Sequence, residues 1–156
     1  GAELAVDGIA VVAIPASERM HAGGAAAARA GGVRFLHRDD TAAVGRALLS
    51  LYSKGEFDGY VARVKAEQPQ DADYVLKRTL PDIELCRERG FAVSLGEWRR
   101  EIFGVAAPLY RTPSGDCLSI NCGIPSFRFS AEQIERECGP RILGLARSIT
   151  SLVASG

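Results

Sequence analysis

Three short apolar runs follow one another between Phe91 and Gly123, and this succession constrains the fold more than any other feature of the sequence. The runs read FAVSL, IFGVAAPLY and CLSINCG. The last two are joined by Thr112-Pro113-Ser114-Gly115, a combination of residues typical of a tight turn. The pattern predicts three consecutive β-strands in a mainly antiparallel sheet.

Helical periodicity precedes this unit. A first helix is expected to begin with Asp40 or Thr41 as its cap, and to bury one stripe of apolar residues, namely Val44, Ala47, Leu48, Leu51 and Tyr52. A second helical segment is expected over residues 57–67. A third runs from Asp73 to a stop at Gly90, with a kink or a restart at Pro81 because proline has no N–H to donate.

A last helix is expected after the strands. Ser130 and Gln133 have the spacing of a capping box, in which each side chain satisfies a free backbone N–H of the other residue. An apolar stripe follows, made of Ile134, Cys138, Ile142, Leu145, Ile149 and Leu152. A break in this helix is expected at Gly139-Pro140.

The N-terminal part of the chain predicts a β-hairpin over residues 3–14, with Asp7-Gly8 as its turn. The Gly/Ala-rich stretch 22–32 is interpreted as a surface loop, and residues 33–36 as a short strand. The order of hairpin, helices, strands and helix favours one α+β domain spanning residues 1–156. Because the chain opens directly in a strand, we expect it to be part of a longer protein.

Charge and hydropathy exclude several classes of partner. The 156 residues carry 19 basic and 19 acidic side chains, so no excess positive charge is available to hold nucleic acid or an anionic membrane. No apolar run approaches the roughly 18 to 20 residues that span a bilayer. These features are those expected of a cytoplasmic domain that does not bind DNA by itself.

Catalytic and metal-binding motifs are absent from the sequence, and no cofactor is expected. The cysteines Cys86, Cys117, Cys122 and Cys138 form no C-x-x-C pair, which argues against a zinc site and favours reduced, buried thiols. Glu97 and Glu101 could serve as an acid/base pair, but the charged segment GEWRRE favours solvated partners of Arg99 and Arg100.

The strand Cys117–Gly123 has one apolar and one small, polar face. Alternation places Cys117, Ser119, Asn121 and Gly123 together. In the preceding strand, Gly104, Ala106 and Pro108 also share a face. If the two small faces coincide, they form either a concave floor for a ligand or a solvated outer surface of the sheet.

Four segments resemble the effector-binding domain of IclR-family bacterial transcriptional regulators, and they occur in that family's order. They are TAAVGRALLS (41–50), LCRERGFAVS (85–94), GVAAPLYRTPSGDCLSINCG (104–123) and the closing GPRILGLARSITSLV (139–153). The resemblance implies a GAF-like fold, an antiparallel sheet flanked by helices with a small-molecule pocket on one face. It also implies a homo-oligomer, dimer or tetramer, and DNA contact only through a winged helix-turn-helix domain that this chain lacks.

The resemblance further implies a small organic acid as the effector and a set of candidate contacts. The N–H groups of Ala43 and Val44 could receive a carboxylate. The other positions carried over are Ser94, Ile102, Gly104, Asn121 and Gly123. Family members that bind very small oxo-acids have an aspartate, a cysteine and two serines at the positions where this chain has Ser94, Gly104, Asn121 and Gly123. The glycines predict a larger, aromatic acid, with Phe35 or Trp98 as packing surfaces.

Two other functions are considered from the residues. A thiol-dependent enzyme on a GAF-like fold would need an accessible cysteine of low pKa, and Cys117 is the one candidate because the other three lie on apolar faces. A ligand-free oligomerisation domain would instead have a closed, fully packed interior.

Overall fold

The computed structural model describes residues 9–14 and 43–155. Within these ranges the elements are β1 (Ile9–Ile14), α2 (Ala43–Leu49), α3 (Lys54–Glu67), α4 (Ala72–Arg89), β2 (Ala92–Arg99), β3 (Ile102–Arg111), β4 (Cys117–Pro125), α5 (Ala131–Gln133), the π-helical turn η3 (Ile134–Cys138) and α6 (Gly139–Ser155). No helix in this part of the chain has the length and apolar character that crossing a bilayer demands.

The strands form one antiparallel sheet in the order β1-β4-β3-β2. The three consecutive strands predicted after Phe91 are therefore confirmed, and the turn after β3 contains Gly115 at a φ of 90°, a value that favours glycine. β1 extends the sheet by pairing with β4. The predicted hairpin turn at Asp7-Gly8, the stretch 22–32 and the strand 33–36 lie outside the described residues.

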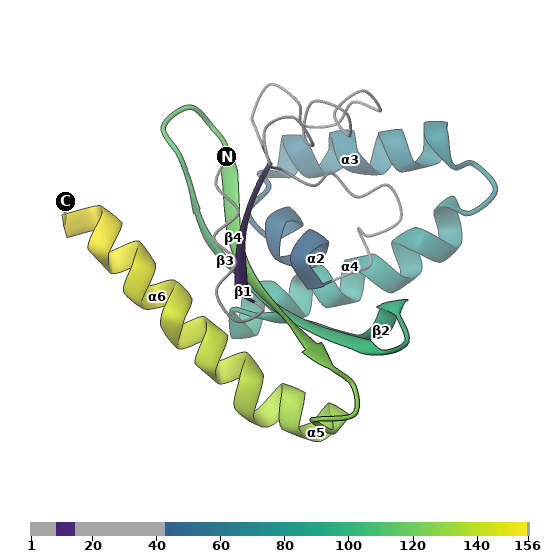
Figure 1. Ribbon diagram of the computed structural model, residues 1–156. Helices are drawn as coiled ribbons and strands as arrows, with labels where there is room; N and C mark the ends of the chain where they lie inside the picture. The colour runs from purple at the N-terminus through teal and green to yellow at the C-terminus, as the bar shows by residue number, and fades with distance from the viewer. Residues whose placement is uncertain (1–8, 15–42, 156) are drawn as a thin grey trace.

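Helices cover both faces of the sheet (Figure 1). α6 crosses one face, where Val105, Ile120 and Ile142 belong to one apolar cluster. α2, α3 and α4 lie on the other side, and α2 packs directly on the strands through Ala43 and Ala47. The sheet is thus the central layer of the domain, with helices on each of its faces.

The helices before the sheet follow the predicted order with shifted ends. α2 ends at Leu49, so Leu51 and Tyr52 of the expected stripe lie beyond the helix. α3 begins earlier than expected because Ser53 and Glu56 form a capping box. α4 passes through Pro81 without restarting, and it ends as predicted at Gly90, whose φ is 88°.

The C-terminal helix differs from the prediction at its centre. The capping box of Ser130 and Gln133 is confirmed. The expected break at Gly139-Pro140 is wrong, since a π-helical turn leads directly into α6. In that turn the Gly139 N–H reaches back to the carbonyl of Ile134, and the wider turn carries the helix past Pro140.

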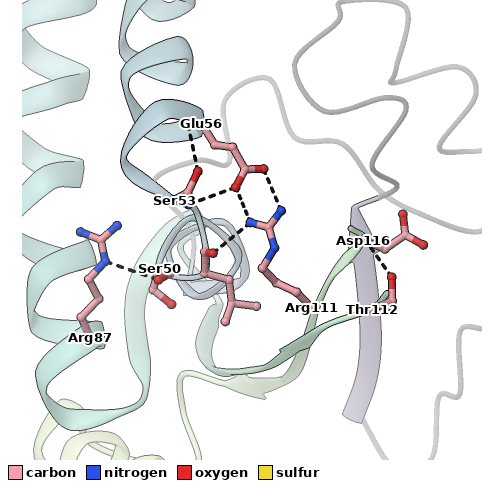
Figure 2. A network of polar contacts seen from close by, with 8 residues as sticks. Ser50, Ser53, Glu56, Arg87, Arg111, Thr112 and Asp116 are labelled. Atoms are coloured by element: carbon pink, nitrogen blue, oxygen red, sulfur yellow. Dashed lines mark hydrogen bonds and ion pairs between the residues drawn. The ribbon is translucent and has the colours of Figure 1, made fainter. Parts of the chain in front are cut away.

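An arginine at the end of β3 ties the sheet to the helical layer (Figure 2). Arg111 donates to the Leu51 carbonyl at 3.2 Å and pairs with both carboxylate oxygens of Glu56, near the start of α3. The hydrogen bonds from Arg111 hold the pKa of Glu56 at about 2, and bonds from Ser53 act in the same direction. The segment that connects α2 and α3 is fixed to the sheet by this pair.

Candidate functional site

The row of small residues predicted on one face of the sheet is present. Across β2, β3 and β4, Ser94 is paired with Gly104 and Gly104 with Gly123, so the three residues share a face. In the next row Ala106 is paired with Asn121. The two small faces inferred from alternation therefore coincide.

The space above this row differs between its two glycines. A Cβ placed on Gly104 would lie 2.8 Å from the Ser94 hydroxyl oxygen and 3.6 Å from the Ala43 Cβ. Among the described residues, a Cβ on Gly123 would meet only the Ile102 Cγ2, at 3.6 Å, and Gly123 is exposed. The space beside Gly104 is thus filled by neighbouring side chains, whereas the space beside Gly123 is open among the described residues.

α2 covers the middle of the same face. Ala43 and Ala47 are buried against Ala92 and Ala106, and Val44 packs at their edge. Alanine methyls allow the helix to approach the strands closely, and this approach leaves little room over the Ala106 row. Any ligand on this face is consequently confined to the end of the floor near Ser94, Gly104 and Gly123, or to space beside α2.

Two polar atoms on this face lack partners. The Ser119 Oγ and the Asn121 Oδ1 are buried, and within the part of the chain that the structure describes neither makes a hydrogen bond. Leaving a buried polar atom unpaired costs about 1–3 kcal/mol. The arrangement can therefore recover free energy by binding a molecule that offers matching polar groups.

The helix that covers this face, α2, is held in place by a buried arginine, Arg46, which the sequence patterns do not indicate as a site residue. Arg46 is 1% exposed and donates to the Val93 carbonyl at 2.7 Å. Its guanidinium also contacts Glu97 at 2.5 and 3.2 Å and Asp82 at 3.2 Å. Arg46 joins α2 to β2 one residue before Ser94, so it positions α2 relative to the row of small residues on the sheet.

Glu97 is bound by arginines distant in the sequence, whereas the charged segment around it predicts Arg99 and Arg100 as partners. Glu97 pairs with the buried Arg46 and, at 3.5 Å, with Arg78 of α4. Its side chain is 21% exposed. The carboxylate is therefore a structural partner of α2 and not a free acid or base.

The remaining predicted contacts are placed as follows. Ile102 lies at the Gly123 end of the floor, and Ala43 lies over Gly104. Phe35 lies outside the described residues, and the structure does not describe the side chain of Trp98. Of the eight predicted effector contacts, Ala43, Ser94, Ile102, Gly104 and Gly123 are thus brought together, with Asn121 one row away and Val44 at the edge of α2.

The cysteine proposed for a thiol-dependent reaction is inaccessible. Cys117 has 0% exposure, and Cys86 has 1%, with its pKa raised by burial. Cys122 and Cys138 are partly buried, and burial raises the pKa of both thiols. All four cysteines are free thiols, and no group of side chains suited to hold a metal occurs among the described residues.

An antiparallel sheet covered by helices on both faces, with a row of small residues under one of them, defines the class of GAF-like α+β domains. Within that class, the chain belongs to the family described as bacterial transcriptional regulator IclR C-terminal, whose model matches residues 4–151. The resemblance stated from the sequence, and the fold class it implied, are confirmed.

Solved structures agree with this assignment. An IclR-family transcriptional regulator from Brucella abortus is 30% identical over 70% of this chain and 41% of its own, with a TM-score of 0.64. The repressor BlcR from Agrobacterium tumefaciens is 19% identical over 76% of this chain and 49% of its own, with a TM-score of 0.59. This chain spans less than half of either protein.

A third similar structure contains a ligand. It is the inducer-binding domain of PobR from Acinetobacter, a double mutant in complex with 3-hydroxybenzoic acid. It is 15% identical over 72% of this chain and 65% of its own, with a TM-score of 0.55. At this identity the likeness shows the fold alone. No curated protein sequence matches the chain significantly.

Proposed function

We propose that this chain is the ligand-sensing domain of a bacterial transcriptional regulator. It binds a small organic acid, with an aromatic acid as the favoured ligand, and thereby modulates DNA binding by a separate winged helix-turn-helix domain. The observation that carries the proposal is the row Ser94–Gly104–Gly123 beneath α2, open at Gly123 and flanked by the unpartnered Asn121 Oδ1.

The polar atoms of the floor support a ligand that both accepts and donates hydrogen bonds. The Ser94 hydroxyl can donate to a carboxylate, as can the N–H groups of Ala43 and Val44. The Asn121 Oδ1 can only accept, so it calls for a hydroxyl or amine on the ligand. A hydroxy-substituted aromatic acid meets both requirements, and a domain of the same fold is known in complex with 3-hydroxybenzoic acid.

Gly104 and Gly123 bear on the size of ligand that the site can take. Gly123 leaves the floor open, with Ile102 as its apolar neighbour, and a flat ring can lie against backbone that carries no side chain. Ring burial would supply the apolar part of the affinity. A very small oxo-acid would leave this apolar surface uncovered.

A thermal-shift screen of the chain tests the proposal. We expect 3-hydroxybenzoate or benzoate to raise the melting temperature, and glyoxylate or pyruvate to have no effect. Asn121→Ala should abolish the shift caused by 3-hydroxybenzoate while the variant remains folded. Ser148→Ala, on the exposed side of α6, is the matched control. Stabilisation by the oxo-acids alone would overturn the volume argument, and an unchanged response of Asn121→Ala would remove this residue from the site.

The link to DNA is tested in the full-length regulator. Gel retardation of its own promoter region should change when the effector is added. The Asn121→Ala variant should keep its DNA binding and lose this response. If effector and DNA bind independently in the unsubstituted protein, the proposed modulation is wrong.

Self-association is the other part of the proposal, as a dimer or a tetramer. Large apolar side chains are exposed at the C-terminal part of the domain: Leu152 is 73% exposed, Val153 50% and Phe127 87%. A contiguous exposed apolar patch often marks a contact surface, and we assign Leu152 and Val153, neighbours at the end of α6, to this contact. Leu152→Glu should lower the mass measured by light scattering, whereas a wild-type chain that is monomeric at high concentration would contradict self-association.

A further inference from the structure

A second cavity lies on the face of the sheet opposite to the proposed effector site. It has a volume of about 340 Å³, opens to solvent, and is lined by β4, α6 and the segment that joins them. Its walls include the apolar side chains of Val105, Ile124, Phe129, Ile142 and Leu145. This volume falls in the range of small-molecule sites, and the α6 side of the sheet has no role in the proposed sensing mechanism.

Two arginines line this otherwise apolar cavity. Arg128 follows β4 and Arg141 lies in the first turn of α6, and both are exposed at their outer ends. Neither guanidinium takes part in an ion pair with another described residue. Glu132, the acid nearest to Arg128 in the sequence, pairs with Arg136, and the charge of Glu137 acts on Cys138 together with that of Arg141.

The two thiols in the wall do not neutralise this positive charge. Cys122 and Cys138 both line the cavity. Burial raises the pKa of each thiol, so both remain protonated at neutral pH. The cavity therefore combines an apolar interior with a net positive mouth.

We propose that this cavity binds an apolar monocarboxylate, with its carboxylate at Arg128 and Arg141 and its hydrocarbon chain against Ile124, Ile142 and Leu145. Arginine matches the planar geometry of a carboxylate and remains charged at every physiological pH. An acyl chain of about ten carbon atoms suits a pocket of this kind, which has few polar groups beyond the arginines.

This second site is distinct from the proposed effector site and does not depend on it. β4 separates the two, because Cys122 and Gly123 are consecutive residues whose side-chain directions alternate between the faces. Gly123 borders both sites, so the residues that separate them are Asn121 for the effector proposal and Arg128 and Arg141 for the second site. Either site can therefore fail without the other.

Calorimetric titration of the chain with decanoate tests the proposal. We expect binding that strengthens from hexanoate to decanoate by roughly fourfold for each buried methylene. Arg128→Gln and Arg141→Gln should each weaken decanoate binding about fivefold, the amount typical of an exposed ion pair. Arg147→Gln, an exposed arginine of α6 that does not line the cavity, is the control and should bind like the wild type. Decanol should bind equally to all of these variants.

Two results of the titration would overturn the proposal. One is absence of decanoate binding to the wild type, and the other is equal decanoate binding by wild type and by the Arg128→Gln/Arg141→Gln double variant. Asn121→Ala should retain decanoate binding. If that substitution removes it, decanoate occupies the effector face and the second site is wrong, whereas the effector proposal is supported.

Thiol labelling locates the ligand without any substitution. Cys122 and Cys138 line the cavity, whereas Cys86 and Cys117 are 1% and 0% exposed and serve as internal standards. With decanoate at about ten times its Kd, labelling of Cys122 and Cys138 should slow about tenfold. Labelling at an unchanged rate would place the carboxylate elsewhere and contradict the proposal.

Discussion

The Ser94 hydroxyl occupies the place where a side chain on Gly104 would begin. A Cβ on Gly104 would lie 2.8 Å from the Ser94 Oγ, closer than two such atoms can stand without movement. Because Ser94 is 5% exposed and α2 covers it, the hydroxyl has little freedom to move away. This contact couples the stability of the sheet to the shape of the candidate site.

Gly104→Ala should therefore destabilise the domain. Overpacking of a buried contact costs about 1–3 kcal/mol, which urea denaturation can measure. Gly144→Ala is the matched control, because Gly144 lies inside α6 with nothing within 4 Å of its Cβ position. That substitution should stabilise the helix by about 0.5–1 kcal/mol. Equal effects of the two substitutions would contradict the contact with Ser94.

Among the charged side chains that contact one another around Glu97, Arg46 should be the one whose replacement, by methionine, lowers stability most. Arg46→Met would leave Glu97 and Asp82 facing an apolar side chain, and breaking one half of a buried pair costs about 3–5 kcal/mol. Arg78→Met removes the outer partner of the same Glu97 from a side chain that is 47% exposed, so it should cost about 1 kcal/mol or less. Thermal unfolding of the two variants checks this difference, and similar losses would show that Arg46 does not anchor α2.

Much of this architecture can be predicted from the sequence, because alternation and turn chemistry act locally. The faces of β4, the pairing of small residues around Gly104 and the capping box at Ser130 all follow from spacing. Arg46 does not, since the rule of one apolar stripe assumes a helix with a solvated side. α2 is buried nearly all round, and an arginine within it is satisfied only by strands and helices distant in sequence.

The uninterrupted helix at Gly139 depends on a tertiary contact in the same way. Sequence rules treat Gly139-Pro140 as a break, but a Cβ on Gly139 would lie 2.2 Å from the Phe91 ring. The glycine is thus required by the packing of the helix on the start of β2. Local rules cannot register this contact because Phe91 and Gly139 are far apart in the chain.

Gly139→Ala should destabilise the domain by about 1–3 kcal/mol, because the methyl group and the Phe91 ring cannot share the same space. A smaller partner should relieve the clash. Phe91→Leu lowers stability by itself, but the double variant Gly139→Ala/Phe91→Leu should be more stable than the sum of the two single effects predicts. Strict additivity in denaturant titrations would rule out the clash.

The ion pair of Glu56 and Arg111 should make stability depend on acid pH. The pKa of Glu56 falls from 4.5 to about 2 in the folded chain, mainly through its hydrogen bonds with Arg111. A carboxyl group whose pKa is lower in the folded than in the unfolded chain stabilises the folded state at pH values above its unfolded pKa. The contribution of Glu56 is therefore complete at pH 7 and is lost as the pH falls from 4.5 toward 2. The side chains of Arg111 and Glu56 are 34% and 24% exposed, so solvent screens the pair in part, and we expect a contribution of about 1 kcal/mol.

Glu56→Gln isolates this contribution. The stability difference between wild type and variant should be constant near neutral pH and shrink as the pH falls through that window. Asp58→Asn in the same helix is a control, since its partner Lys54 lies 3.8 Å away and both side chains are exposed. A difference that grows on acidification would have the wrong sign for this ion pair.

Gly123→Ala separates folding from ligand binding, and this prediction rests on the proposed function. Within the described ranges a Cβ at this position meets only the Ile102 Cγ2, at an ordinary 3.6 Å, so the unliganded variant should be about as stable as the wild type, within about 0.5 kcal/mol. The new methyl group would nevertheless occupy the open end of the floor. Stabilisation by 3-hydroxybenzoate should then fall or disappear. Full retention of the aromatic acid's effect would place its ring away from Gly123, since a bound ring at that position cannot share its volume with a methyl group.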